Sequence, residues 1–231
     1  MLELLQFKKS LLFSQLRELE QIYEAIEKDE EEWKKHSPTQ CPSGCGQCCI
    51  AFEPDLLEIE ADYLALWLIQ NDREKAEAIA DQTYIWPRFL EYPQGCFLFD
   101  PTDDYHCTVY EGRALICRLF GYTSDTGRDG KIRWKPCKYI PEEAFKAGFV
   151  RKQYAEEELR ERLVALPPVM SHYLRKTLSI QPDNAGRTTA MRDILPKAIQ
   201  KMLFLLKYIE LESSVDNNPD DTPTPTSPIA A

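Results

Sequence analysis

The chain has 231 residues, 43% of them hydrophobic, which is enough for one large domain with a substantial core. Its net charge of −10 argues against a nucleic-acid partner, because proteins that bind phosphate backbones normally present a basic surface. The longest apolar run, Met202–Leu206, is far shorter than the ~20 residues of a membrane span. We therefore predict neither a nucleic-acid partner nor a membrane span.

The N-terminal region predicts an amphipathic helix. Apolar residues recur there at spacings of three and four, at Leu12, Leu16, Leu19, Tyr23 and Ile26. We expect residues 1–36 to form this unit, with the helix ending near Lys35 or His36, before Pro38. The stripe is too short to favour a coiled coil, so we expect it to pack on its own domain.

Charged residues interrupt the first apolar stretch, so the sequence shows no secretion signal. We therefore expect a cytoplasmic protein. In a reducing compartment, eight cysteines are better explained as metal ligands than as a disulfide framework.

Residues 37–140 form the predicted cysteine-cluster core. Residues 55–80 contain no proline or glycine and predict one or two helices, with a break at Asn71-Asp72. Residues 86–134 are rich in Pro, Gly, Asp and aromatic residues, which is typical of loops and short hairpins, with Gly127–Gly130 as a hairpin turn.

Residues 141–212 predict helices that pack on this core. We expect them at residues 141–166, 169–178 and 196–211, with Pro196 in the first turn of the last. The last helix is unusually apolar, so a protein partner that binds it is an alternative to its burial. Residues 213–231 are of low complexity and predict a disordered tail. The predicted fold is mainly α, a single helical domain with a cysteine-rich core of loops and short hairpins.

The cysteines carry the strongest chemical signal, because four of them fall within nine residues. The candidate metal ligands are Cys41, Cys45, Cys48, Cys49, Cys96, Cys107, Cys117 and Cys137. Thiolates are the soft ligands preferred by zinc and by iron–sulfur clusters. Adjacent side chains in an extended chain face opposite ways, so Cys48 and Cys49 favour more than one metal or a multinuclear cluster. Zinc, iron and an iron–sulfur cluster all remain open.

Two arginines accompany the downstream cysteines. A short helix would place Arg113 and Cys117 four residues apart on one face. We predict that Arg113 and Arg118 lie behind the ligands, where a cation lowers the pKa of a thiol and partly neutralises a cluster. An alternative is that both form ordinary ion pairs. His106, next to Cys107, is a further candidate ligand.

Several of these elements together resemble a known family. The four-cysteine run is followed by Cys96-Phe-Leu, by Cys107-x-Val-Tyr-Glu-x-Arg113, by Cys117-Arg-x-Phe120 and by Cys137. This order resembles the CxxCxxCC zinc- or iron-chelating domain, also called the YkgJ-type cysteine cluster proteins. Here three residues rather than two separate Cys41 from Cys45, and Ala114 replaces the usual proline. The resemblance implies metal chelation, and some related proteins are flagellin lysine methylases.

We therefore predict a protein that coordinates zinc, iron or an iron–sulfur cluster through up to eight cysteines. The competing functions are an iron–sulfur enzyme or electron carrier acting on a protein substrate, and a thiol–disulfide oxidoreductase. Whether the protein is an enzyme is left open. The spacing Cys41-x3-Cys45-x2-Cys48 also occurs in radical SAM cluster loops, but no alternating strand–helix pattern surrounds it here.

Overall fold

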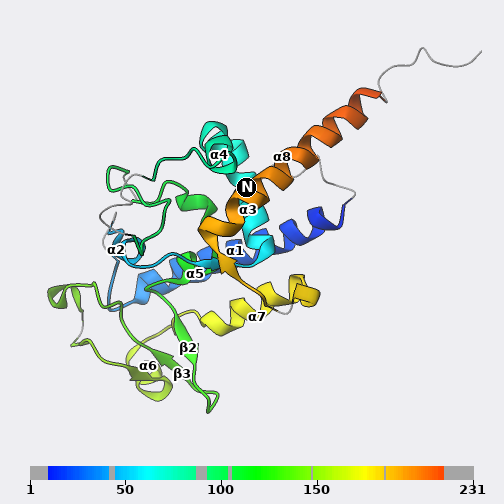
Figure 1. Ribbon diagram of the computed structural model, residues 1–231. Helices are drawn as coiled ribbons and strands as arrows, with labels where there is room; N and C mark the ends of the chain where they lie inside the picture. Colours follow the sequence, from blue (N-terminus) through cyan, green and yellow to red (C-terminus); the bar gives the residue numbers. More distant parts are fainter. Residues whose placement is uncertain are drawn as a thin grey trace, which may run out of the picture.

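The structure is a computed structural model, and it describes residues 10–41, 45–86, 93–103, 106–146, 148–184 and 186–215. Across these ranges helices dominate, and short strands form two small sheets (Figure 1). This confirms the predicted mainly α fold with short hairpins.

The helices differ widely in length. The α-helices are α1 (Leu11–His36), α2 (Gln47–Ile50), α3 (Glu58–Asn71), α4 (Arg73–Ala80), α5 (Leu115–Leu119), α6 (Glu156–Arg162), α7 (Met170–Ile180) and α8 (Met191–Val215). Three 3₁₀ turns are η2 (Tyr110–Gly112), η3 (Glu142–Ala144) and η4 (Pro182–Asn184). The antiparallel sheets are β1 (Asp55–Leu56) with β5 (Thr189–Ala190), and β2 (Ser124–Thr126), β3 (Ile132–Trp134) and β4 (Tyr154–Ala155) in that order.

Helix α1 ends where predicted and has the predicted orientation. It begins at Leu11, and residues 1–9 of the predicted unit lie outside the described residues. Ser10 accepts a hydrogen bond from the Phe13 amide at 3.1 Å and caps its start, and His36 is its last residue. Four residues of the predicted stripe are buried, at Leu16, Leu19, Tyr23 and Ile26. The helix therefore packs on its own domain, as predicted.

Helix α3 lies at the centre of the main core. It is buried on nearly all sides, and it packs against α1, α4 and α8. The predicted break at Asn71-Asp72 is confirmed, because Asp72 accepts a hydrogen bond from the Lys75 amide at 3.1 Å and caps α4. Asp55 and Leu56 are not helical, because they pair with β5 instead.

Helix α8 begins five residues earlier than predicted. Its first amides are bonded by distant residues: the Met191 amide donates to the Pro54 carbonyl at 3.1 Å, and the Arg192 amide donates to the Glu53 carboxylate at 3.2 Å. These tertiary contacts fix the first turn, so Pro196 lies inside the helix rather than in its first turn. Sequence reasoning placed the start at the proline because only local signals were visible.

The end of α8 also differs from the prediction. The helix continues to Val215, so its last three residues fall in the predicted tail, and residues 216–231 lie outside the described residues. Figure 1 shows the C-terminal part of α8 extending beyond the rest of the fold. No helix in the described ranges is long and apolar enough to cross a membrane.

A second, smaller core lies at the end of α1. Trp33 packs edge-to-face against Trp134 of β3, with ring centroids 5.5 Å apart, and Phe149, Tyr154 and Leu159 complete the cluster. The predicted long helix at 141–166 is therefore wrong. Among the described residues of this range only α6 is an α-helix, because Gly148 has a φ of +68° and Tyr154 pairs with Trp134 in a strand.

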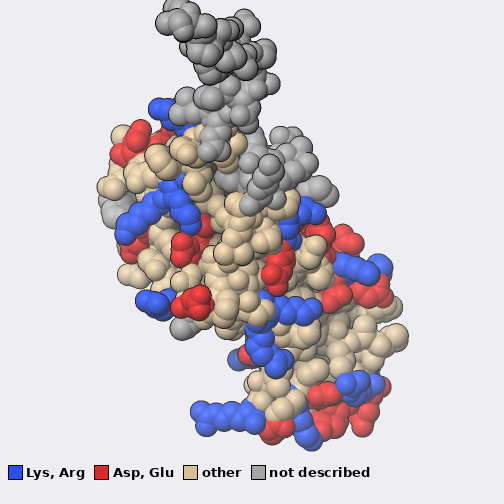
Figure 2. Space-filling model, turned by 90° about the vertical axis from the view of Figure 1, so that its right-hand side faces the viewer, with Lys and Arg blue, Asp and Glu red and all other residues tan. Residues whose placement is uncertain are grey.

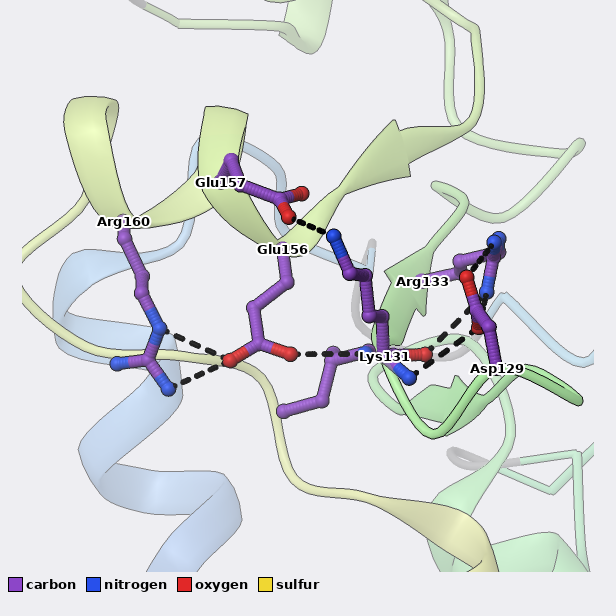
Figure 3. A network of polar contacts seen from close by, with 7 residues as sticks. Asp129, Lys131, Arg133, Glu156, Glu157 and Arg160 are labelled. Atoms are coloured by element: carbon purple, nitrogen blue, oxygen red, sulfur yellow. Dashed lines mark hydrogen bonds and ion pairs between the residues drawn. The ribbon is translucent and has the colours of Figure 1, made fainter.

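The β2–β3 hairpin turns at Gly127–Gly130, as predicted, and the Gly127 amide donates to the Lys131 carbonyl at 2.9 Å. A charged network joins this hairpin to α6 (Figure 3). Within it, Glu156 accepts from the Ile132 amide at 2.9 Å and also bonds Arg160. In Figure 2, basic and acidic side chains are interspersed over the visible face.

Candidate metal centre

All eight cysteines line one cavity of about 480 Å³. They come from separate parts of the domain, namely the segment after α1, helix α2, the loops that follow α4, helix α5 and the loop after β3. All eight lie within the described residues, and none is in a disulfide. The fold therefore brings together residues that lie up to 96 positions apart in the chain, since Cys41 and Cys137 share this wall.

The short helix α2 places two thiols side by side. Gly46 precedes it with a φ of +57°, and the Cys49 amide donates to the Gly46 carbonyl at 2.9 Å. The Sγ atoms of Cys48 and Cys49 are 3.9 Å apart. Two thiolates on one tetrahedral zinc ion, each about 2.3 Å from it, lie about 3.8 Å apart. In an extended chain the side chains of Cys48 and Cys49 would point in opposite directions. The helical backbone of α2 brings them together instead.

Close backbone contacts join the next cysteines to α2. The Cys96 amide donates to the Cys49 carbonyl at 2.9 Å. A Cβ atom added to Gly95 would lie 2.7 Å from the Ile50 carbonyl oxygen, so only glycine fits this approach. Cys107 forms a β-bridge with Phe99, which places its thiol in the same cavity wall.

A buried carboxylate fixes the helix that carries Cys117. Glu60 of α3 accepts hydrogen bonds from the Leu115 amide at 2.8 Å and from the Leu57 amide at 3.1 Å. It thereby bonds the first amide of α5 and connects this helix to the core. Burial raises the pKa of Glu60, although both amides oppose this shift. Glu60 was not singled out in the sequence, where acidic residues are common and only the fold identifies the buried one.

The cavity disfavours most of the thiolates. Burial raises the pKa of Cys41 to about 11 and that of Cys117 to about 12, and it also raises the pKa of Cys96 and Cys107. The hydrogen bond with Cys49 lowers the pKa of Cys48 to about 6. A bound metal cation stabilises the thiolate form of these cysteines. Metal binding here must therefore displace their protons.

Thiols are suitable ligands for zinc and for iron. In this structure they are spread along the cavity wall. Among the described residues, no three Cys, His, Asp or Glu side chains converge closely enough to enclose one ion. The Cys48–Cys49 pair does have the spacing of two ligands on one metal atom.

The two predicted arginines occupy different places. Arg113 lines the cysteine cavity, and its guanidinium carbon is 3.7 Å from the ring centroid of Tyr110. Its Nε is buried without a hydrogen-bond partner in the part of the chain that the structure describes. Arg118 is only 2% exposed and forms an ion pair with Glu27, and its Nε donates to the Arg113 carbonyl at 2.9 Å.

His106 is placed differently from the thiols. Its ring packs against Gly46, where an added Cβ would lie 2.6 Å from it, and its Nδ1 is 2.8 Å from the Asp103 carbonyl oxygen. It is not among the residues that line the cysteine cavity. His106 therefore buttresses the α2 turn.

An aromatic part of the wall was missed by sequence reasoning. Phe52 and Phe120 stack with centroids 5.9 Å apart, and Tyr122 and Tyr139 also line the cavity. Lys34 of α1 lies 4.8 Å over the Tyr122 ring and pairs with Glu30 at 3.3 Å. Of these residues, only Phe120 was indicated by the sequence, as part of the Cys-Arg-x-Phe pattern.

Comparison with known proteins agrees with this site. Residues 40–142 match the family model CxxCxxCC, described as a putative zinc- or iron-chelating domain. The match includes all eight cysteines and confirms the predicted resemblance. No curated protein and no solved structure matches the chain.

Proposed function

We propose that the CxxCxxCC domain of this chain binds zinc or iron in the cysteine cavity, through up to eight thiolates. The single observation that carries this proposal is that all eight cysteines line one cavity. We assign this role to residues 37–140, with the helices on either side supplying apolar support.

We further infer that the centre contains more than one metal atom. Four thiolates saturate a tetrahedral ion, so eight thiols exceed what one ion requires. The cavity of about 480 Å³ also has room for more than one metal atom. Two zinc ions or an iron–sulfur cluster would meet both observations.

Arg113 and Arg118 have distinct parts in this proposal. The guanidinium of Arg113 has no ion pair among the described residues, and it lies in the cavity wall where thiolates would gather. We assign it to charge compensation and to N–H donation toward metal-bound sulfur. Arg118, which bonds the Arg113 carbonyl, acts through Arg113 rather than on the centre itself.

Anaerobic purification with metal and sulfide analysis and a visible spectrum tests the proposal. Brown protein with iron and sulfide would assign an iron–sulfur centre and favour an enzyme or electron carrier. Colourless protein with about two zinc ions per chain would assign a structural or adaptor role. Protein that contains neither metal, and takes up neither on anaerobic reconstitution, would overturn metal binding and leave the thiol–disulfide oxidoreductase.

Cys48→Ser and Cys49→Ser test the adjacent pair. Each should lower the metal content, because the two sulfurs have the separation of shared ligands. Ala51→Ser, which follows α2 and is exposed, is the matched control and should retain full metal content. If either cysteine variant retains it as well, that thiol is not a ligand.

A protein partner on α8 is a second proposal, favoured by two exposed aromatic residues. Phe204 is 68% exposed and Tyr208 is 54% exposed, and their spacing of four residues places both rings on one face of α8. Phe204→Ser with Tyr208→Ser should release a copurified partner without changing the melting temperature. Unfolding of this variant would instead assign both rings to the core.

We place the protein in the cytoplasm, and its eight free thiols support this location.

A further inference from the structure

Helix α8 begins at the wall of the cysteine cavity. Met191, its first residue, lines the cavity, and its amide donates to the carbonyl of Pro54, another lining residue, at 3.1 Å. The next residue, Arg192, forms an ion pair with Glu53, which lies between α2 and β1. Glu53 and Arg192 themselves are not among the described residues that line the cavity.

The ion pair of Glu53 and Arg192 is bidentate. Arg192 Nε lies 2.8 Å from Glu53 Oε1, and its Nη2 lies 2.9 Å from Oε2. Glu53 also accepts a hydrogen bond from the Arg192 amide at 3.2 Å, and its side chain is only 7% exposed. Two parallel N–H···O bonds fix the orientation of the two side chains as well as their distance.

This ion pair brackets the backbone of Cys96. Arg192 Nη2 donates to the Gly95 carbonyl at 3.2 Å, and the Phe97 amide donates to Glu53 Oε2 at 3.3 Å. The two peptide groups that flank Cys96 are therefore each bonded to one member of the ion pair.

The remaining backbone groups of Cys96 have partners that belong to the same arrangement. Its amide donates to the Cys49 carbonyl at 2.9 Å, and its carbonyl accepts from Trp86 Nε1 at 3.2 Å. The guanidinium carbon of Arg192 lies 4.7 Å from the centroid of the Trp86 ring, a favourable cation–π distance. The turn that carries Cys96 is thus held between α2 on one side and the first turn of α8 on the other.

We propose that Glu53 and Arg192 are positioning residues for the metal centre, and that they fix the Cys96 thiol at the place where it ligates. This inference rests on the proposed function, because it assigns how one of the ligands is held. Both residues act through the backbone of Gly95 and Phe97 rather than on the metal itself. The alternative is that the ion pair only fastens the start of α8, in which case its loss would change folding stability and leave the centre unaltered.

Anaerobic titration of the reduced full chain with Co²⁺ tests this proposal, because thiolate ligands give Co²⁺ an intense charge-transfer absorption. Arg192→Gln should weaken Co²⁺ binding about tenfold to a hundredfold, as loss of a group behind the ligands does, and lower the absorption per bound ion. Arg192→Lys retains the charge without the planar fork and should recover part of the affinity. Arg73→Gln breaks an exposed ion pair of the same 2.8 Å length on α4, so it is the matched control and should bind Co²⁺ like the wild type.

A double variant distinguishes positioning from a purely structural role. Cys96→Ser should lose one ligand, and adding Arg192→Gln to it should cause no further loss of affinity, because the ion pair acts through that thiol. Additive losses, or wild-type affinity and absorption in Arg192→Gln, would overturn the proposal and leave the metal centre intact.

Two further outcomes are informative. If Arg192→Gln unfolds, as circular dichroism would show, the comparison passes to Arg192→Lys, and wild-type affinity in that variant would overturn the proposal. A wild-type chain that gives no thiolate absorption with Co²⁺ would overturn the metal centre and the positioning role together.

Discussion

The helical frame and the cysteine cavity are stabilised by different means. Helices α1, α3 and α8 bury apolar side chains in one continuous core, and several of these side chains are fully inaccessible. The cavity wall consists mostly of loops and of two helices only four and five residues long. Part of the cavity wall joins the same core through Leu98 and Leu115, so apolar burial maintains the frame and anchors the wall. The cysteine-bearing turns depend in addition on a few close contacts and on what the thiols bind.

The largest expected effect is that of metal removal, which should affect the two regions differently. After chelation under anaerobic conditions, amides of residues 45–50 and 106–117 should exchange with solvent much faster. Amides in the buried helix α3 should exchange as before, because their protection comes from the apolar core. Hydrogen exchange with mass spectrometry measures both in one experiment. Unchanged exchange at α2 and α5 would show that the wall folds without metal.

Acidification should weaken metal binding by a large factor. The pKa of Cys41 is about 11 and that of Cys117 is about 12, so both thiols are protonated at neutral pH and must lose protons to ligate. Affinity should therefore fall about tenfold per pH unit for each proton displaced, between about pH 8 and pH 6. Competition with a chromophoric chelator, corrected for its own protonation, measures this slope. A slope of zero would exclude these thiols as ligands.

A core truncation should affect the frame and spare the centre. Leu19 of α1 is fully buried, and Leu19→Ala should lower the free energy of unfolding by about 2–5 kcal/mol. Leu11→Ala, on the same helix at 74% exposure, should change it by less than about 0.5 kcal/mol. Urea denaturation measures both. The folded fraction of each variant should have the wild-type metal content, and a metal deficit in Leu19→Ala would mean that the two regions are coupled.

The frame could be predicted from local patterns where those patterns are strong. The apolar stripe gave α1, and Asn71-Asp72 gave the break between α3 and α4. The start of α8 and the loss of helix at 141–154 could not be predicted, because both depend on tertiary partners. Glu53 and Pro54 accept hydrogen bonds from the first amides of α8, and Tyr154 pairs with Trp134 in a strand.

The site could be predicted in composition but not in geometry. Thiol clustering identified the eight residues, and the cavity does contain them all. The convergence of Cys48 and Cys49 depends on the left-handed Gly46 and the four-residue helix after it, which no periodicity indicates. The wall also depends on Glu60, a charged residue whose burial is set by the fold rather than by its neighbours in sequence.

The smallest expected effect on folding distinguishes the two arginines. Arg118 of α5 is buried against α1 and donates to the carbonyls of Glu111 and Arg113, so Arg118→Gln should lower the free energy of unfolding by about 1–3 kcal/mol. Arg113 Nε has no hydrogen-bond partner among the described residues, so Arg113→Gln should destabilise the fold less than Arg118→Gln does. It should instead weaken metal affinity about tenfold to a hundredfold, as loss of a donor behind the ligands does. Arg113→Lys retains the charge without the planar group, so it should recover part of that affinity. Equal losses of folding stability in both variants, with unchanged metal affinity in Arg113→Gln, would assign Arg113 to the frame as well.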